Sequence, residues 1–414
     1  MKKILIILIA VILVALIAFS GWYFFLRIPN VPIGETVRKA LPFGSGDNAQ
    51  LPTANVKQPT AKIDDPQIVA KTNLFQISAE PVAGAVVLNR GASTGSTSSP
   101  QATIVRYVDR ATGHIYDIDL TTRTKTKISN QTLPKIYEVY FRADGNSVLL
   151  RSLKDNSDVV ENVTITLTPP KLPSTDTLYT ATSTTLRKDM GDIAVGLGNA
   201  LFYTLRDPSS IVMSAFNGTG VKTLFNSPFS NWRLSSAGNI LIAYTKASAD
   251  IAGYAYAVNT SGGALAKILG PLNGLIAIPN TSNSRVLYSY IENGQTKIFA
   301  KNLKSNALTE ILPNTLAEKC VWSIKDADTV FCAVPTNSPG TGEPDSWYMG
   351  QTHFSDRIWL FDTKVSIARV LVEPRVILDV DIDAMELKLS SNEDYLIFIN
   401  KTDLSLWVLK LEQF

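Results

Sequence analysis

Histidine and cysteine are scarce in this chain, which has two of each among 414 residues. The sequence contains no H-E-x-x-H, G-x-S-x-G or C-x-x-C motif, so zinc peptidase, serine hydrolase and thiol-redox chemistry have no motif to rest on. We therefore expect no catalytic residues and no cofactor, and we interpret the chain as a protein that is not an enzyme.

An excess of charge of one sign is also missing. The net charge is +3, and Lys2, Lys3 and Arg27 beside the first apolar run account for all of it. A nucleic-acid binder would need a basic face to contact phosphates. Without these three residues the net charge is about zero, so we do not expect nucleic acid as a partner.

A long apolar run without a charged residue opens the chain at residues 4–26. As a helix it would be about 35 Å long, which is enough to cross a hydrocarbon core of roughly 30 Å. The small residues Ala18 and Ser20 leave a cleaved signal peptide as an alternative, but Trp22 to Phe25 extend the run with interfacial aromatic rings and favour an uncleaved signal-anchor. We expect this segment to lie in the lipid bilayer, with the N-terminus in the cytoplasm and the bulk of the chain outside it.

The predicted domains are a transmembrane signal-anchor at residues 1–27, a juxtamembrane segment and flexible linker at 28–66, and a folded domain at 67–414. Residues 35–41 could form a short helix on the membrane surface or belong to a solvated connector. Residues 44–66 have almost no large apolar side chain and several breakers, so they predict a flexible spacer.

The rest of the chain repeats one pattern, in which a strand, a polar turn and an apolar strand follow one another. The turns fall near Gly145, Gly198, Gly238, Asn283, Ala327 and Asn392. Their spacing brackets the roughly 40–50 residues of a four-stranded propeller blade. Two further strands follow each hairpin, and a divergent seventh copy occupies residues 83–129. The sequence predicts an all-β, seven-bladed β-propeller.

The last predicted blade lacks one strand, because the chain ends soon after residues 404–411. Residues 67–78 precede the first blade and are similar to the fourth strands elsewhere. We expect this N-terminal strand to pair beside residues 404–411 and close the ring, which would protect the last open edge.

The turns SSAGN, RADGN and SSNED resemble the degenerate S-P-D-G turn of TolB-type and WD40-like propellers. An ordered set of segments is also similar to a family of uncharacterised, single-pass membrane-anchored propellers from uncultured small-genome (candidate phyla radiation) bacteria: EPVAGAVVL (80–88), VRYVDRATGHIYDIDL (105–120), KISNQTLPKIYEVYFRADGNSVLLR (127–151), KCVWS (319–323), CAVP (332–335), and WYMG with FSDRIW (347–359). The resemblance covers residues 83–414 and implies a fold but no activity. The chain departs from TolB, which has an extra N-terminal domain where this chain has an anchor and linker.

The two cysteines lie symmetrically about the turn at Asp326, so Cys320 and Cys332 face each other across two strands. An oxidising exterior would favour a disulfide between them. A reducing compartment would leave two buried thiols.

Asp379, Asp381 and Asp383 have the spacing that starts a calcium loop, but Ala384 and Ser390 stand where that loop needs glycine and glutamate. We interpret them as an exposed acidic loop, with a metal site as the alternative. Asp356, Asp379 and Asp381 would be the first carboxylates to consider if the chain were a hydrolase.

A long insertion at residues 336–354 is the main candidate for binding. It carries Trp347, Tyr348, His353 and Phe354, with Asp356 just after it. Aromatic residues in a loop on a rigid scaffold are typical of recognition surfaces. The alternative is that the loop folds down and plugs the central channel.

These features predict a membrane-anchored, extracytoplasmic β-propeller that acts as a noncatalytic protein-interaction or scaffold module of the cell envelope. Its partners would be the bilayer, through residues 4–26, and other envelope proteins. A glycan or ligand receptor is the first alternative, and a propeller hydrolase is the second.

Overall fold

The computed structural model describes residues 73–90, 102–154, 157–171, 176–238 and 240–411. The predicted anchor at residues 4–26 and linker at 28–66 lie outside them. Among the described residues, no helix is both long and apolar enough to cross a bilayer. The chain divides into two compact units, Met1–Thr60 and Ala61–Phe414, and the following account concerns the second.

The described chain consists mainly of antiparallel strands that pair in chain order. The first three sheets have four strands each. They are β2 (Val82–Arg90), β3 (Ala102–Asp109), β4 (Ile115–Asp119) and β5 (Lys125–Ser129); β6 (Ile136–Phe141), β7 (Ser147–Leu153), β8 (Val160–Thr168) and β9 (Thr180–Thr185); and β10 (Met190–Val195), β11 (Ala200–Arg206), β12 (Ser209–Ala215) and β13 (Lys222–Asn226).

A seven-stranded sheet follows, and it contains β14 (Trp232–Ala237), β15 (Ile240–Thr245), β16 (Ala252–Val258), β17 (Ala266–Pro279), β18 (Arg285–Glu292), β19 (Gln295–Asn302) and β20 (Leu308–Glu310). The sequence pattern predicted two separate strands where β17 runs without a break. The backbone stays paired through the middle of this strand, because Asn273 lies opposite Ala252 on one side and Ile291 on the other.

Two more four-stranded sheets complete the unit. One has β21 (Cys320–Trp322), β22 (Thr329–Pro335), β23 (Asp356–Asp362) and β24 (Ile367–Val372), and the other has β25 (Ala384–Leu389), β26 (Tyr395–Asn400), β27 (Leu406–Lys410) and β1 (Leu74–Ser78). Short helical turns occur in three connections: η1 (Ala317–Lys319), α3 (Asp345–Tyr348) and α4 (Pro374–Leu378).

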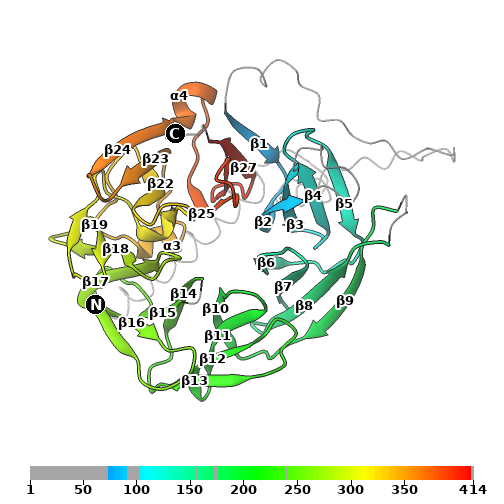
Figure 1. The fold of residues 1–414 in the computed structure, drawn as a ribbon, viewed down its shortest axis with the longest axis horizontal. Coiled ribbons are helices and arrows are strands. Elements are labelled where there is room, and N and C mark those ends of the chain that lie inside the picture. The colour runs from blue at the N-terminus through cyan, green and yellow to red at the C-terminus, as the bar shows by residue number, and fades with distance from the viewer. Residues whose placement is uncertain (1–72, 91–101, 155–156, 172–175, 239, 412–414) are drawn as a thin grey trace, which may run out of the picture. The chain divides into compact units, whose positions relative to one another are not determined.

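The sheets follow one another around a central axis (Figure 1). Contacts between innermost elements trace the circle, from β2 through β6, β10, β14, β17, η1 and β25 back to β2. This arrangement of radiating four-stranded units is a β-propeller. It confirms the all-β propeller class predicted from the repeats.

The N-terminal strand closes the ring at the last sheet. β1 pairs antiparallel with β27, and Leu74 lies opposite Leu409. The predicted closure by residues 67–78 is thus confirmed for Leu74–Ser78, while residues 67–72 lie outside the described part of the chain. Strands from the two ends of the unit therefore share one sheet.

The second strand of most sheets is buried on both faces, which explains its continuous apolar sequence. In β22, every residue from Val330 to Pro335 is buried, and β26 is buried from Leu396 to Asn400. Neighbouring sheets pack against both faces of such a strand, so the alternation typical of a half-exposed strand is lost. The apolar core accordingly lies in clusters between successive sheets.

Glycine is required at one of the predicted turns by both conformation and space. Gly145 has a φ of 69°, and a Cβ atom there would lie 2.6 Å from Cδ1 of Leu88. A larger residue would need the strained left-handed backbone and would also collide with the neighbouring sheet.

Candidate functional site

The insertion at residues 336–354 connects β22 to β23 and is folded. The backbone N–H of Thr336 donates to the carbonyl of Ser355 over 2.8 Å, which closes the insertion at its base. The single turn α3 lies within it. Three of the four α3 side chains point in different directions. Asp345 contacts the loop between β15 and β16, Trp347 contacts a buried charge cluster, and Tyr348 lies beside Glu318 at the innermost part of the ring.

The buried charge cluster has Lys319 at its centre. Its ammonium lies 2.9 Å from Oδ2 of Asp356 and 2.5 Å from Oδ1 of Asp383, and all three side chains are inaccessible to solvent. The ammonium also donates to the carbonyl of Ala384 over 2.9 Å. One positive charge is therefore held between two carboxylates, one in β23 and one just before β25.

Aromatic rings of the insertion cover this cluster. Nζ of Lys319 lies 4.9 Å from the ring centroid of Trp347 and 5.1 Å from that of Phe354. The indole N–H of Trp347 donates to Asp383, 2.9 Å from Oδ2, and the backbone N–H of Phe354 donates to the same oxygen over 3.2 Å. The buried charges therefore anchor the insertion to the ring.

Asp356 is the carboxylate of this cluster with a strongly perturbed pKa. Burial raises the pKa of Asp356 to about 6, although the Lys319 ammonium opposes that rise. Its Oδ2 accepts the backbone N–H of Ala384 over 2.7 Å, while Oδ1 has no hydrogen-bond partner in the structure. No surface opening reaches this atom, since the whole residue is buried.

Glu318, the neighbour of Lys319, points toward the innermost part of the ring instead. Its carboxyl interacts electrostatically with the phenol of Tyr348, and burial raises the pKa of Glu318. Burial likewise raises the pKa of Tyr348 well above its ordinary value. The consecutive η1 residues Glu318 and Lys319 thus have different surroundings. Glu318 faces the interior of the ring, and Lys319 lies in the buried charge cluster.

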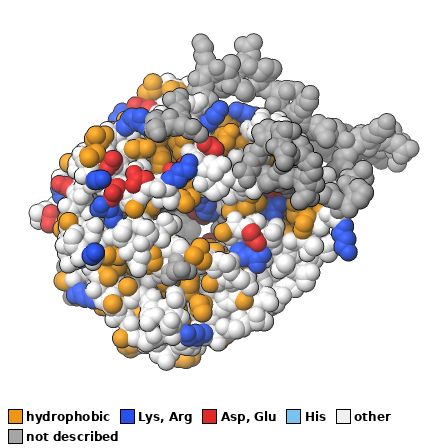
Figure 2. Space-filling model, viewed as in Figure 1, with side chains coloured by type: hydrophobic (Ala, Val, Ile, Leu, Met, Phe, Trp, Pro, Cys, Tyr) orange, Lys and Arg blue, Asp and Glu red, His pale blue; other side chains and the backbone are white. Residues whose placement is uncertain are grey.

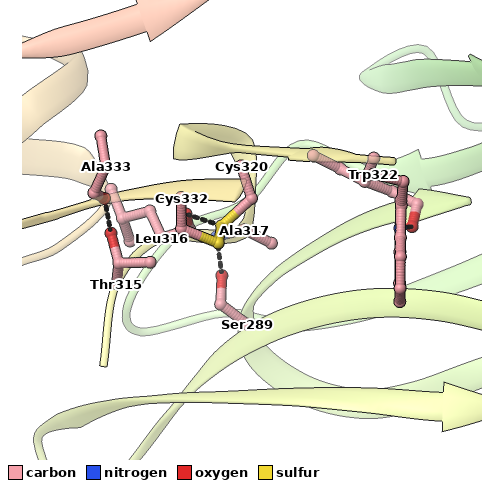
Figure 3. Close-up of a disulfide and its surroundings, with 9 residues drawn as sticks. Ser289, Thr315, Leu316, Ala317, Cys320, Trp322, Cys332 and Ala333 are labelled. Atoms are coloured by element: carbon pink, nitrogen blue, oxygen red, sulfur yellow. Dashed lines mark hydrogen bonds between the residues drawn. A yellow bond between two sulfur atoms is a disulfide. The ribbon is translucent and has the colours of Figure 1, made fainter. Parts of the chain in front are cut away.

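A disulfide holds η1 in position (Figure 3). Cys320 follows η1, lies opposite Cys332 across β21 and β22, and is bonded to it through sulfur. On the other side of η1, Thr315 donates its hydroxyl to the carbonyl of Ala333 over 2.7 Å, and Ser289 accepts the N–H of Ala317 over 2.9 Å. These contacts fix the direction of both η1 charges.

Charges on the innermost strands form ion pairs with neighbouring strands. Nη1 of Arg151 lies 2.6 Å from Glu138, and Nη1 of Arg233 lies 2.6 Å from Asp192. Burial raises the pKa of Asp192, and the Arg233 guanidinium opposes the rise. Figure 2 shows positive, negative and hydrophobic side chains interspersed over the face that it displays.

An open groove lies beside the insertion, between β13 of one sheet and β14–β16 of the next. Its volume is about 870 Å³. Its walls are mainly apolar and aromatic and include Phe225, Phe229, Trp232, Ile251, Tyr254, Tyr256 and Leu265. Asp345 of α3 completes the lining, and its Oδ2 accepts the backbone N–H of Ala249 over 2.7 Å.

The aromatic wall of the groove is ordered by ring packing. Trp232 packs edge-to-face against Phe229 at 5.3 Å and against Tyr256 at 5.7 Å between ring centroids. The indole N–H of Trp232 donates to Oγ of Ser227 over 3.0 Å, which satisfies its only polar group. Phe229 remains 41% exposed and Ile251 64% exposed, so the groove offers apolar surface to solvent.

The structure corrects the prediction that the insertion presents its aromatic residues for binding. Trp347, Phe354 and Asp356 are buried, and Tyr348 is half-buried. The reason is the Lys319 cluster, which draws these side chains inward. Only His353 of the predicted set is exposed.

The three aspartates of the predicted acidic loop do not converge. Asp383 is buried against Lys319, whereas Asp379 and Asp381 are exposed and lie near Arg375. Oδ1 of Asp381 also accepts the hydroxyl of Ser355 over 2.7 Å. The interpretation of all three as an exposed loop is therefore wrong for Asp383. Within the described residues, no group of three or more histidine, cysteine or acidic side chains is placed to hold a metal ion.

The carboxylates considered for a hydrolase are likewise separated by environment. Asp356 is enclosed with Lys319, while Asp379 and Asp381 lie outside on the α4 connection. This arrangement gives a substrate no surface that contacts all three.

Sequence reasoning missed Lys319 and the groove. Lys319 looked like an ordinary surface lysine in the segment AEKC. The groove had a visible signal, because FNSPFSNW and YAY place aromatic residues at 225–232 and 254–256. Those residues fell in connections and strands that the repeat pattern had already explained.

Comparison with known proteins places the chain in no sequence family, because no family model and no curated protein matches it. Solved structures that it is similar to include an oligogalacturonate lyase from Vibrio parahaemolyticus, with 11% identity, a TM-score of 0.47, and coverage of 83% of this chain and 99% of that one. Another is the β-propeller domain of the Trilobed protease from Pyrococcus furiosus, with 12% identity, a TM-score of 0.48, and coverage of 79% and 96%.

The tricorn protease is also similar, with 12% identity, a TM-score of 0.37, and coverage of 77% of this chain and 28% of that one. These similarities are weak, and the propeller fold described above rests on the strand order and contacts of this chain.

Proposed function

We propose that the protein is a membrane-anchored, extracytoplasmic β-propeller that serves as a noncatalytic protein-interaction module of the cell envelope. The groove between β13 and β14–β16 carries this proposal. Its volume of about 870 Å³ falls within the roughly 300–1,000 Å³ of typical binding pockets, and such pockets are mostly apolar with a few polar groups. Partner proteins would bind through this groove.

We propose that the ring has seven blades. The seven-stranded sheet would be two blades that share β17, whose first half pairs with β16 and whose second half pairs with β18. With the other sheets, each of four strands, this gives seven blades. The resemblance to anchored propellers of candidate phyla radiation bacteria belongs to the same proposal.

The anchor would be the apolar run at residues 4–26, with the ring outside the cytoplasm. The first described residue, Asn73, accepts the N–H of Lys410 through its carbonyl. Leu411, which follows Lys410, donates its N–H to Asp394 in the β25–β26 turn. The described chain therefore enters the ring at the end of the last sheet where this turn lies. Loops 227–231 and 246–251 at the groove connect strands at the opposite end of their sheet from such turns. Protease added to intact cells should release a fragment cut within residues 44–66, and protection until lysis would contradict the location.

A ligand receptor is the second candidate, because the same aromatic groove could take a small molecule. The hydrolase alternative has less support, since Glu138 and Asp192 are paired with arginines and Asp383 with Lys319.

Site-specific photo-cross-linking in intact cells tests the interaction role. A photoreactive residue replaces Ile251 at the groove mouth or, as a control, Lys304 on the exposed turn after β19. The proposal expects an envelope protein to be cross-linked from position 251 and not from 304. Equal labelling from both positions, or none from 251, would argue against the groove as the interaction site.

A further inference from the structure

The groove has one cationic side chain in its lining that is left without a charge partner. Lys246 is exposed there and makes no ion pair with a described residue. Its backbone N–H is held by the carbonyl of Asn231 over 2.8 Å, so the residue is fixed at the edge between β15 and the following loop. A ligand with a negative group would find a counter-charge at this position.

The one acidic side chain in the lining, Asp345, is hydrogen-bonded to the backbone and makes no ion pair with Lys246. Oδ2 of Asp345 accepts the N–H of Ala249, and this bond joins α3 to the loop at the groove. Asp250 belongs to the same loop but does not line the groove. Lys267, on the adjoining β17, lies with Nζ 4.9 Å from the ring centroid of Tyr254 and adds a second positive charge near the aromatic wall.

The groove therefore combines an apolar and aromatic floor with a lysine that makes no ion pair with a described residue. We propose that it recognises an apolar peptide segment of a partner protein that carries a carboxylate, with the apolar side chains against Trp232, Tyr256 and Ile251 and the carboxylate at Lys246. This inference rests on the proposed function and specifies the chemistry of the partner. Apolar contacts supply most of the affinity, and the rim charge supplies orientation.

Matched peptides test the charge requirement. The full-length protein in lipid nanodiscs is titrated by calorimetry with Gly-Ser-Gly-Leu-Phe bearing a free C-terminal carboxylate and with the same peptide bearing a C-terminal amide. An exposed ion pair should favour the carboxylate roughly two- to fivefold. Gly-Ser-Gly-Ser-Ser with a free carboxylate should bind more weakly than both, and empty nanodiscs provide the blank.

Two groove variants and one matched control locate the effect. Lys246→Met keeps the apolar stem and should make the two Leu-Phe peptides bind equally. Ile251→Asp should weaken the carboxylate peptide more than the amide, because it places a like charge at the mouth. Lys304→Met removes an exposed lysine elsewhere and should preserve the wild-type ratio.

The outcomes separate this inference from the proposed function. Equal binding of carboxylate and amide to the wild type, or an unchanged ratio in Lys246→Met, overturns the carboxylate preference and leaves the groove as a binding site. Failure of every peptide to bind overturns this inference, whereas the proposed function fails only if position 251 also gives no cross-link to an envelope protein. Tighter binding of 3-phenylpropionate than of the carboxylate peptide would overturn the peptide assignment in favour of a small-molecule carboxylate.

Discussion

Lys319 connects three separate parts of the chain at one buried point. Its ammonium is shared by Asp356 at the start of β23 and Asp383 just before β25, and the Trp347 and Phe354 rings of the insertion cover it. Charges removed from water are costly unless they are paired and hydrogen-bonded. The cluster therefore specifies where the insertion packs, while its net contribution to stability depends on keeping every member.

Replacing Lys319 with methionine should destabilise the ring strongly. The variant keeps most of the side-chain volume but leaves Asp356 and Asp383 buried without their cation, and breaking a buried pair costs about 3–5 kcal/mol. The free energy of unfolding would be measured by chemical denaturation at pH 7. The matched control Lys364→Met, at an exposed position, should change it by less than about 0.5 kcal/mol.

Neutralising an acid should restore part of this loss. In Lys319→Met with Asp383→Asn, one of the two uncompensated charges is gone, and the amide oxygen can still accept the Trp347 indole N–H. If Lys319→Met alone were as stable as the wild type, the buried cluster would not be formed in solution.

At the scale of elements, η1 and the β21–β22 hairpin form the support for that lysine. β21 has only three residues, so its ladder to β22 is short. The disulfide between Cys320 and Cys332 adds a covalent link where hydrogen bonds are few. It encloses a short loop, since the sequence separation of the cysteines is 12.

Loss of the disulfide should lower the free energy of unfolding by about 2–4 kcal/mol, because the bond restricts the unfolded chain. Protein unfolded in denaturant with reductant should therefore show a lower midpoint than protein without it. The variant with Cys320→Ala and Cys332→Ala should have the same denaturation midpoint with and without reductant. Two freely alkylatable thiols in freshly isolated protein would contradict the bond.

Elements were predictable from the sequence where one local pattern determines them. The turns at Gly145 and Gly198 and the apolar strands after them follow from hydrophobic runs broken by residues that tolerate a left-handed backbone. The insertion was not predictable in the same way. Its conformation depends on Lys319 and Asp383, which are distant in sequence, and no local pattern reveals that a lysine will be buried.

The same distinction applies to the groove. Its walls come from β13, β14–β16 and Asp345 of α3, so no single segment contains its shape. Aromatic residues at 225–232 were visible in the sequence, but their convergence with Tyr254 and Tyr256 required the packing of two sheets. Binding surfaces formed between repeats are therefore harder to predict than the repeats themselves.

At the scale of the whole molecule, the ring depends on its closing strand. β1 supplies the outer strand of the last sheet, with Leu74 and Ile77 buried and Gln76 exposed. The cation of Arg123, from the first sheet, lies 3.7 Å from the ring centroid of Phe75. β1 thus joins the last sheet to the first by packing as well as by hydrogen bonds.

Removing β1 should destabilise the ring far more than removing the linker. A chain beginning at residue 80 leaves β27 as an open edge and loses the apolar contacts of Leu74 and Ile77, each of which is worth about 2–5 kcal/mol against a typical domain stability of about 5–15 kcal/mol. A chain beginning at residue 67 keeps these contacts. Thermal unfolding and size exclusion should show earlier melting or aggregation only for the shorter chain.

Point variants in the longer chain separate burial from the mere presence of the strand. Leu74→Ala and Ile77→Ala should each lower the melting temperature, whereas Gln76→Ala, at an exposed position of the same strand, should change it little. The order of effects follows from burial, because Leu74 and Ile77 pack into two different core clusters while Gln76 is exposed to solvent. If the chains beginning at 67 and 80 were equally stable, and if Leu74→Ala had no more effect than Gln76→Ala, the ring would have to close without β1.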